Sequence, residues 1–277
     1  MRASVQFQLQ VYFPEPVRGL NQIFRLTPRG FDSQEVREWR VDVLPDATLR
    51  RGEDAFGNVV HSCSHDGPLD SLTVMAEGLI ETHDAAGVVR GLVEKFPLDV
   101  FLRDAPATHA GGELAAFARD ALAKEADPLG RMHILMGALH KTLTFAAEET
   151  EAPRPAPEVF SARAGSAREL AQVFVAAARD LNVPARFVSG FYLGVGDVGE
   201  ASPHHAWAEA FVDPIGWIGF DPALGFCPRD AHLRLATGLD YFGAAPRRAV
   251  CLTTGREDRR AALNVDAGRQ ASWQFQQ

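Results

Sequence analysis

The first third of the chain alternates hydrophobic and polar residues, which is the pattern of strands with one buried face. Val5, Phe7, Leu9 and Val11 alternate with polar neighbours. Similar short runs recur to about residue 90, and prolines and glycines separate them. Many short strands at regular spacing are typical of two packed sheets. The pattern therefore predicts an N-terminal β-sandwich over about residues 1 to 95.

After Pro97 the hydrophobic residues recur three and four positions apart, which is the spacing of amphipathic helices. Two segments show it, and each predicts one helix. The residues concerned are Leu114, Phe117, Ala118, Ala121 and Leu122 in the first segment, and Met132, Leu135, Met136, Leu139 and Leu143 in the second.

A third helix is predicted to begin at Ser166, which suits the N-cap position. Glu169 stands at the third helical position and completes a capping-box pattern. Asn182 and Pro184 end the helix. The segments 185–195, 204–212 and 216–222 then read as strands. A helix followed by antiparallel strands predicts an α+β domain over about residues 105 to 277.

The last two of these strands bring two titratable residues together. In the strand 204–212 every second residue shares a face, so His205, Trp207 and Glu209 point the same way. A tight turn follows, and Asp221 ends the next strand. Pairing about this turn sets position 205 roughly opposite residues 221–224. A carboxylate there can reach the imidazole and hold its tautomer.

The start of the third helix adds a further element to this pair. Helix N-termini carry unpaired N–H groups and positive potential. Both lower the pKa of a thiol and stabilise an oxyanion. A helix start, then a histidine, then an aspartate is the plan of a Cys-His-Asp acyl-transfer site. Position 167, where the thiol would stand, is alanine.

The chain resembles the bacterial transglutaminase-like family of the papain-like superfamily, which contains candidate cysteine proteases. The resemblance covers nearly the whole chain and rests on several ordered motifs. Its N-terminal half resembles the β-rich leader of that family through "FRLTPR" and "DAFGNVV". The core motifs are "GSARE" (165–169), "PARFVSGF" (184–191), "HAWAE" (205–209) and "GWIGFDP" (216–222).

The resemblance implies a role for each site residue. The nucleophilic cysteine of the family falls on Ala167, the general base on His205 and its orienting carboxylate on Asp221. Trp207 and Arg168 are the candidate substrate contacts. The implied activity is hydrolysis of peptide or glutamine amides, or acyl transfer to an amine. The implied partner is a peptide or protein substrate, and no cofactor is implied.

Ala167 has two explanations, and the first is favoured. The alanine is an engineered knock-out of an active enzyme, as the intact His205, Trp207 and Asp221 suggest. Alternatively the chain is a natural pseudoenzyme that binds a peptide or protein without catalysis. In either case the chain as given is expected to be inactive in thiol chemistry.

Other residues near the motifs have simpler interpretations. Ser166 is better explained as a helix cap than as a substitute nucleophile, and Cys227 lies in a loop with no helix terminus in view. Arg168 is expected to be structural or solvated if it does not bind substrate. For Glu209, a salt bridge and support of the site are equally favoured.

Composition excludes several classes of protein. The formal net charge of −8 and the pI of about 5.6 argue against a nucleic-acid binder. No apolar run is long enough to span a membrane, and the first residues have no leader pattern. Three cysteines make no disulfide framework, so a cytoplasmic chain is expected. "HSCSH" (61–65) holds metal-ligand residue types without zinc spacing, so no metal is predicted. The oligomeric state is not readable from the sequence.

Overall fold

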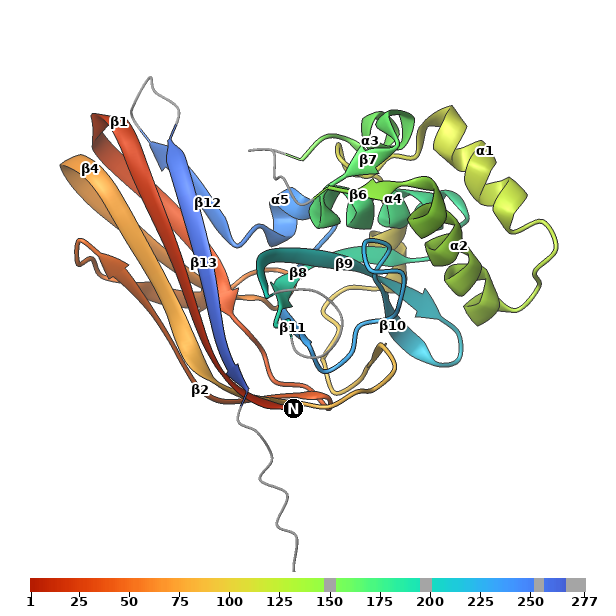
Figure 1. Ribbon diagram of the computed structural model, residues 1–277, viewed down its shortest axis with the longest axis horizontal. Helices are drawn as coiled ribbons and strands as arrows, with labels where there is room; N and C mark the ends of the chain where they lie inside the picture. Colours follow the sequence, from red (N-terminus) through yellow and green to blue (C-terminus); the bar gives the residue numbers. More distant parts are fainter. Residues whose placement is uncertain (147–152, 195–200, 252–256, 268–277) are drawn as a thin grey trace, which may run out of the picture.

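The computed structural model describes residues 1–146, 153–194, 201–251 and 257–267. Figure 1 shows three layers: a sheet of long strands, a smaller sheet beside it, and a group of helices on the far side of the smaller sheet. The predicted α+β class with a β-rich N-terminal region is confirmed. Among the described residues, no helix is long and apolar enough to cross a membrane.

The first layer is one antiparallel sheet of six strands. Two long strands, β1 and β4, pair along most of their length and form its centre. β2 and β3 pair with β4, while β12 and β13 pair with β1. The bounds are β1 Arg2–Thr27, β2 Gln34–Leu44, β3 Arg50–Glu53, β4 Val59–Thr82, β12 Arg247–Cys251 and β13 Asp258–Ala267.

Hydrogen bonds through β1 and β4 connect all six strands into one sheet, and the predicted packing of a β-sandwich stays a prediction. Some of the prolines that seemed to separate short strands lie inside long ones, whereas Pro28 and Pro45 directly follow β1 and β2. β1 runs through Pro14, and β4 runs through Pro68. The pairing register shifts between Tyr12 and Gly19, next to both prolines. Proline is tolerated in strands at such bulges, so it marks irregular pairing here and not a strand end.

The two predicted domains also share strands. β12 and β13 come from the segment predicted as the second domain, yet they extend the N-terminal sheet through β1. In the opposite direction, the short β5 (Val88–Val89) pairs with β10 (Gly216–Phe220) of the second sheet. Boundaries at about residues 95 and 105 therefore do not divide the strands of the two sheets.

The second sheet has five strands in the order β11-β8-β9-β10-β5. Its helices include the three predicted ones, here α1, α2 and α4. The bounds are η1 Leu98–Leu102, α1 Gly111–Ala121, α2 Pro128–Thr142, β6 Thr144–Phe145, α3 Ala156–Ala162, β7 Ala164–Gly165, α4 Ala167–Asp180, β8 Ala185–Tyr192, β9 Ser202–Val212, β10 Gly216–Phe220, β11 His232–Gly238 and α5 Tyr241–Ala244.

α4 is the central helix of this layer, and all but one of its 14 residues are buried. It packs on β8 and β9. Ala206, Ala208 and Ala210 form the face of β9 that belongs to the same buried cluster, and their small side chains allow close approach. Its start is the predicted capping box: Ser166 Oγ accepts from the Glu169 N–H, and Glu169 Oε2 accepts from the Ser166 N–H.

The two sheets pack directly against each other through one hydrophobic cluster. Phe191 and Leu233, on the second sheet, belong to the same buried cluster as the inward side chains of β1 and β4. The rings of Phe7 and Phe191 stack with their centroids 5.0 Å apart. Burial of this apolar surface fixes the N-terminal sheet beside β8 and β9, which carry the candidate site.

Candidate active site

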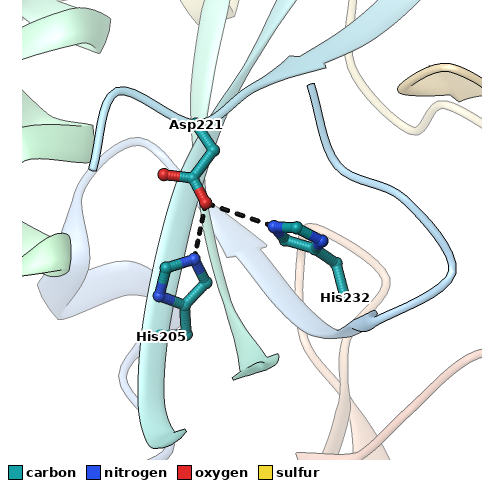
Figure 2. Close-up of side chains that lie close together, drawn as sticks. All are labelled: His205, Asp221 and His232. Atoms are coloured by element: carbon teal, nitrogen blue, oxygen red, sulfur yellow. Dashed lines mark hydrogen bonds and ion pairs between the residues drawn. The ribbon is translucent and has the colours of Figure 1, made fainter. Parts of the chain in front are cut away.

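His205 and Asp221 form a buried pair, as the strand register predicts. His205 lies on β9, and Asp221 follows the last residue of β10. The β9–β10 hairpin pairs Phe220 with Ala208, so its open end brings the next residue, Asp221, towards His205. His205 Nε2 lies 2.6 Å from Asp221 Oδ2 (Figure 2). Both side chains are almost completely shielded from solvent.

Both oxygens of the Asp221 carboxylate accept hydrogen bonds. Oδ1 accepts the backbone N–H groups of Ala223 and Leu224 at 2.9 and 3.1 Å. Burial alone would raise the pKa of Asp221, but the charge and hydrogen bond of His205, with a hydrogen bond from His232, hold that pKa well below its usual range. The carboxylate is therefore ionised, and His205 Nε2 must carry the proton between them. The base lone pair of neutral His205 is on Nδ1.

His232, at the start of β11, is a member of the site that the sequence interpretation missed. Its Nε2 lies 3.2 Å from the same Asp221 Oδ2, as Figure 2 shows. Its Nδ1 accepts the backbone N–H of Arg229 at 3.2 Å, so the proton is on Nε2. Burial lowers the pKa of His232, against the opposing effect of Asp221, which favours a neutral donor. No motif marks this histidine in "RDAHLRL", and only the folded strand order brings it to Asp221.

The three residues also have the donor types of a metal site, and their ligand atoms lie within 4.8 Å of one another. A metal needs a lone pair on each imidazole nitrogen that binds it. His232 Nε2 has none available while the Arg229 N–H occupies Nδ1. The arrangement therefore fits two imidazole donors on one carboxylate better than a metal centre.

The ring of Trp207 lies close to the rings of both histidines. Its ring centroid is 6.2 Å from that of His205 and 5.3 Å from that of His232, with an edge-on contact to the latter. Gly190, opposite His205 on β8, makes room for it, because a Cβ there would lie 2.6 Å from the Trp207 ring. Trp207 is buried and supports the rings, so its proposed contact with substrate stays a prediction.

Arg168 and His205 face the same cavity, which has a volume of about 660 Å³. Arg168 is the second residue of α4, and its neighbour Ala167 occupies the first helical position. The guanidinium of Arg168 is buried, and its Nη1 donates to Tyr241 Oη at 2.8 Å. Its centre also stacks 4.8 Å from the Tyr241 ring. The solvated position considered for Arg168 is therefore wrong, and α4 begins at the cavity that His205 lines.

Comparison with known proteins agrees with this geometry. Residues 115–222 match the model of the Transglutaminase-like superfamily, and residues 3–81 match the Bacterial transglutaminase-like N-terminal region. The chain is a transglutaminase-like protein. It is 24% identical over 248 residues to the uncharacterized protein ML0607 of Mycobacterium leprae, covering 84% of this chain and 87% of that one.

A solved structure shares the fold of nearly the whole chain. A candidate cysteine protease from Cytophaga hutchinsonii superposes with a TM-score of 0.77 at 17% identity, covering 96% of this chain and 90% of that chain. The periplasmic domain of TgpA from Pseudomonas aeruginosa is more distant, with a TM-score of 0.40 at 14% identity and coverages of 79% and 90%.

The substitute nucleophiles considered above are poorly placed for the chemistry. Ser166 Oγ is occupied as the helix cap. The Sγ of Cys227 lies 4.0 Å from His133 Nδ1, and burial raises the pKa of its thiol to about 11. A thiol with that pKa is almost entirely protonated near neutral pH and reacts slowly. The assignment of the nucleophile position to Ala167 stays a prediction.

Glu209, two residues beyond Trp207 on the same face of β9, belongs to a buried ion network. Its Oε2 accepts from Arg186 Nε at 2.6 Å, and its Oε1 accepts from Arg234 Nε at 2.7 Å. Burial opposes ionisation, but the two arginines outweigh it and lower the pKa of Glu209 to about 2. Of the two roles considered for Glu209, the salt bridge is the one that the structure supports.

Replacing His232 by phenylalanine is expected to destabilise the chain by about 1.5 to 3 kcal/mol at pH 7, because Asp221 loses one donor to a buried charge. The difference should shrink as the pH falls below about 6.5, because burial lowers the pKa of His232, so the unfolded chain takes up a proton at this residue that the folded chain does not. Urea unfolding at pH 7 and pH 3 measures both.

Two variants control this experiment. His232→Gln keeps an N–H donor and should recover part of the loss, whereas His83→Phe replaces an exposed histidine and should change little. Equal effects of His232→Phe and His83→Phe at pH 7 would show that the bond from His232 contributes nothing.

Proposed function

We propose that this fold performs Cys-His-Asp acyl transfer on peptide or glutamine amides when position 167 carries a thiol. The observation that carries the proposal is the buried His205–Asp221 pair, whose geometry leaves Nδ1 of His205 as the base, at a cavity where α4 begins. This is the arrangement that nucleophilic catalysis needs: a base, a group that orients it and a helix start.

The reaction would begin with transfer of the thiol proton to His205 Nδ1. The thiolate would attack the amide carbonyl carbon, and the positive start of α4 would stabilise the oxyanion. The imidazolium would return the proton to the leaving amine as the C–N bond breaks, leaving a thioester. Water or a second amine would then attack the thioester, with His205 again taking the proton. Asp221 would stabilise the imidazolium throughout.

The alanine at position 167 removes the atom on which this sequence of steps depends. We favour an engineered knock-out, because the base, its carboxylate and the capped helix are all retained. The alternative is a natural pseudoenzyme. The codon for residue 167 in the source genome decides between them, and a native alanine codon contradicts the knock-out.

The test of the catalytic proposal is turnover by the Ala167→Cys chain. That chain is expected to cleave members of a mixed peptide pool near pH 7, or to couple them to an added primary amine, with both products read by mass spectrometry. The unchanged chain is the matched control and should do neither. Absence of both products from the Ala167→Cys chain would refute the catalytic proposal.

The second candidate function is a peptide-binding module, favoured by the cavity being present without the nucleophile. Here the unchanged chain itself should retain peptides from the same pool. Binding that persists with Ala167, together with no turnover by the Ala167→Cys chain, would favour the module over the enzyme.

A further inference from the structure

The cavity that His205 lines lies between the two sheets. One wall comes from the second sheet and its helices, through Arg168, Ser189, Gly190, His205 and Tyr241. The opposite wall comes from the N-terminal sheet, through residues of β1 and β13. The volume of about 660 Å³ is within the range of ligand sites, which is room for a few residues of an extended chain and not for a folded domain.

The wall from the N-terminal sheet is apolar and firmly held. Phe7, Leu9 and Leu26 of β1 line it and are themselves well packed. Phe7 stacks on Phe191 of the second sheet. Well-packed side chains of this kind keep their positions, so this wall offers a preformed apolar surface.

β13 adds a small side chain to the same wall. Ala261 lies opposite Leu9 in the antiparallel pairing and lines the cavity. Along β13 the residues alternate between partly buried and exposed, so Ala261 faces inward and its neighbour Ala262 faces solvent. A methyl group at position 261 leaves open the space that a larger side chain would fill.

Charged groups stand at another part of the cavity. Glu257 lies between two arginines: it accepts from Arg247 Nη1 at 2.6 Å, and its Oε1 is 2.8 Å from Arg259 Nε. All three residues line the cavity. The cavity therefore has an apolar part, formed by the β1 side chains, and a charged part, formed by the ion-paired cluster. The two parts suit an extended polypeptide that carries an apolar side chain on its polar backbone.

We propose that the N-terminal sheet is one wall of the substrate cleft, and that its Phe7–Leu9–Ala261 surface receives an apolar side chain of an extended polypeptide near the reacting amide. The inference rests on the proposed function, because it places the substrate of that same site. It gives the β-rich N-terminal region a role in substrate selection. Burying an apolar side chain in such a pocket typically changes affinity by one to two orders of magnitude.

The test measures peptide binding to the unchanged chain. Blocked Gly-Ser hexapeptides serve as probes, with a single Leu, a single Asp or no guest residue, and the guest is moved through each position. At its best position, the Leu peptide should bind at least tenfold more tightly than the Asp and guest-free peptides. Ala261→Phe should weaken Leu-peptide binding at least tenfold. Ala262→Phe, the matched control on the solvent face of the same strand, should change it less than twofold.

Two further measurements keep the inference separable from folding and from the proposed function. Ala261→Leu fills less of the cavity and should give an intermediate loss, which decides the matter if Ala261→Phe fails to fold. In the Ala167→Cys background, Ala261→Phe should leave alkylation by iodoacetamide unchanged, because that probe is small. An unreactive introduced thiol would overturn the catalytic proposal alone. No preference for Leu, or equal effects at 261 and 262, would overturn this inference.

Discussion

Replacing Ala167 by cysteine is expected to create a thiol that iodoacetamide labels about 10- to 100-fold faster at pH 6 than an ordinary cysteine. A helix N-terminus and a neighbouring imidazolium both favour the thiolate, which is the reactive form. His205 becomes that imidazolium when its Nδ1 takes the thiol proton, because Asp221 already accepts the hydrogen bond from its Nε2. Labelling rates read peptide by peptide in the mass spectrometer measure the effect.

The unchanged chain supplies the background for this measurement. It contains Cys63, Cys227 and Cys251, and burial raises the pKa of the first two. The second control is His205→Asn together with Ala167→Cys, which should slow the labelling of the introduced thiol and leave only the effect of the helix N-terminus. An introduced thiol that labels no faster than the native cysteines, or that ignores the loss of His205, contradicts the proposed pair.

Replacing Glu209 by alanine is expected to destabilise the chain by about 3 to 5 kcal/mol at pH 7, because two arginines are left buried without their shared carboxylate. Arg186 keeps its 2.6 Å bond to Glu94, whereas Arg234 has Glu209 as its ion-pair partner among the described residues. Urea unfolding monitored by circular dichroism measures the difference between the Glu209→Ala and unchanged chains.

The same substitution has a defined pH dependence. The depressed pKa of Glu209, about 2, contributes stability that is complete above the ordinary carboxyl range near 4.3 and is lost as the pH falls towards 2. The difference in the free energy of unfolding between the Glu209→Ala and unchanged chains should therefore decrease over that pH interval. Asp180→Ala, which breaks a partly exposed pair with Arg119, should cost at most about 1 kcal/mol. Similar costs at positions 209 and 180 would contradict the buried network.

Local signals were enough to predict the centre of the second sheet and its helix. The capping box at Ser166 defines where α4 begins, and the alternation from His205 to Val212 defines β9. Because the turn after β9 is short, pairing about it also places Asp221 near His205. These predictions use contacts between residues close in sequence, which spacing alone can describe.

Longer-range features escaped the same reasoning. β13 pairs with β1 across nearly the whole length of the chain, and no periodicity encodes such a partner. His232 reaches Asp221 only because β11 lies beside β8 in the sheet order. The burial of Arg168 depends on Tyr241, which lies 73 residues further along. Each depends on tertiary packing that overrides the local pattern.

The most direct measurement of the central claim is the detection of an acyl group on residue 167. The Ala167→Cys chain is mixed with the peptide pool, quenched in acid to preserve thioesters, digested and analysed by mass spectrometry. The proposed Cys-His-Asp chemistry predicts an acyl adduct on the fragment that contains position 167, and its loss when His205→Asn is added. Peptide cleavage that proceeds equally in the unchanged Ala167 chain, or an adduct indifferent to His205, would contradict it.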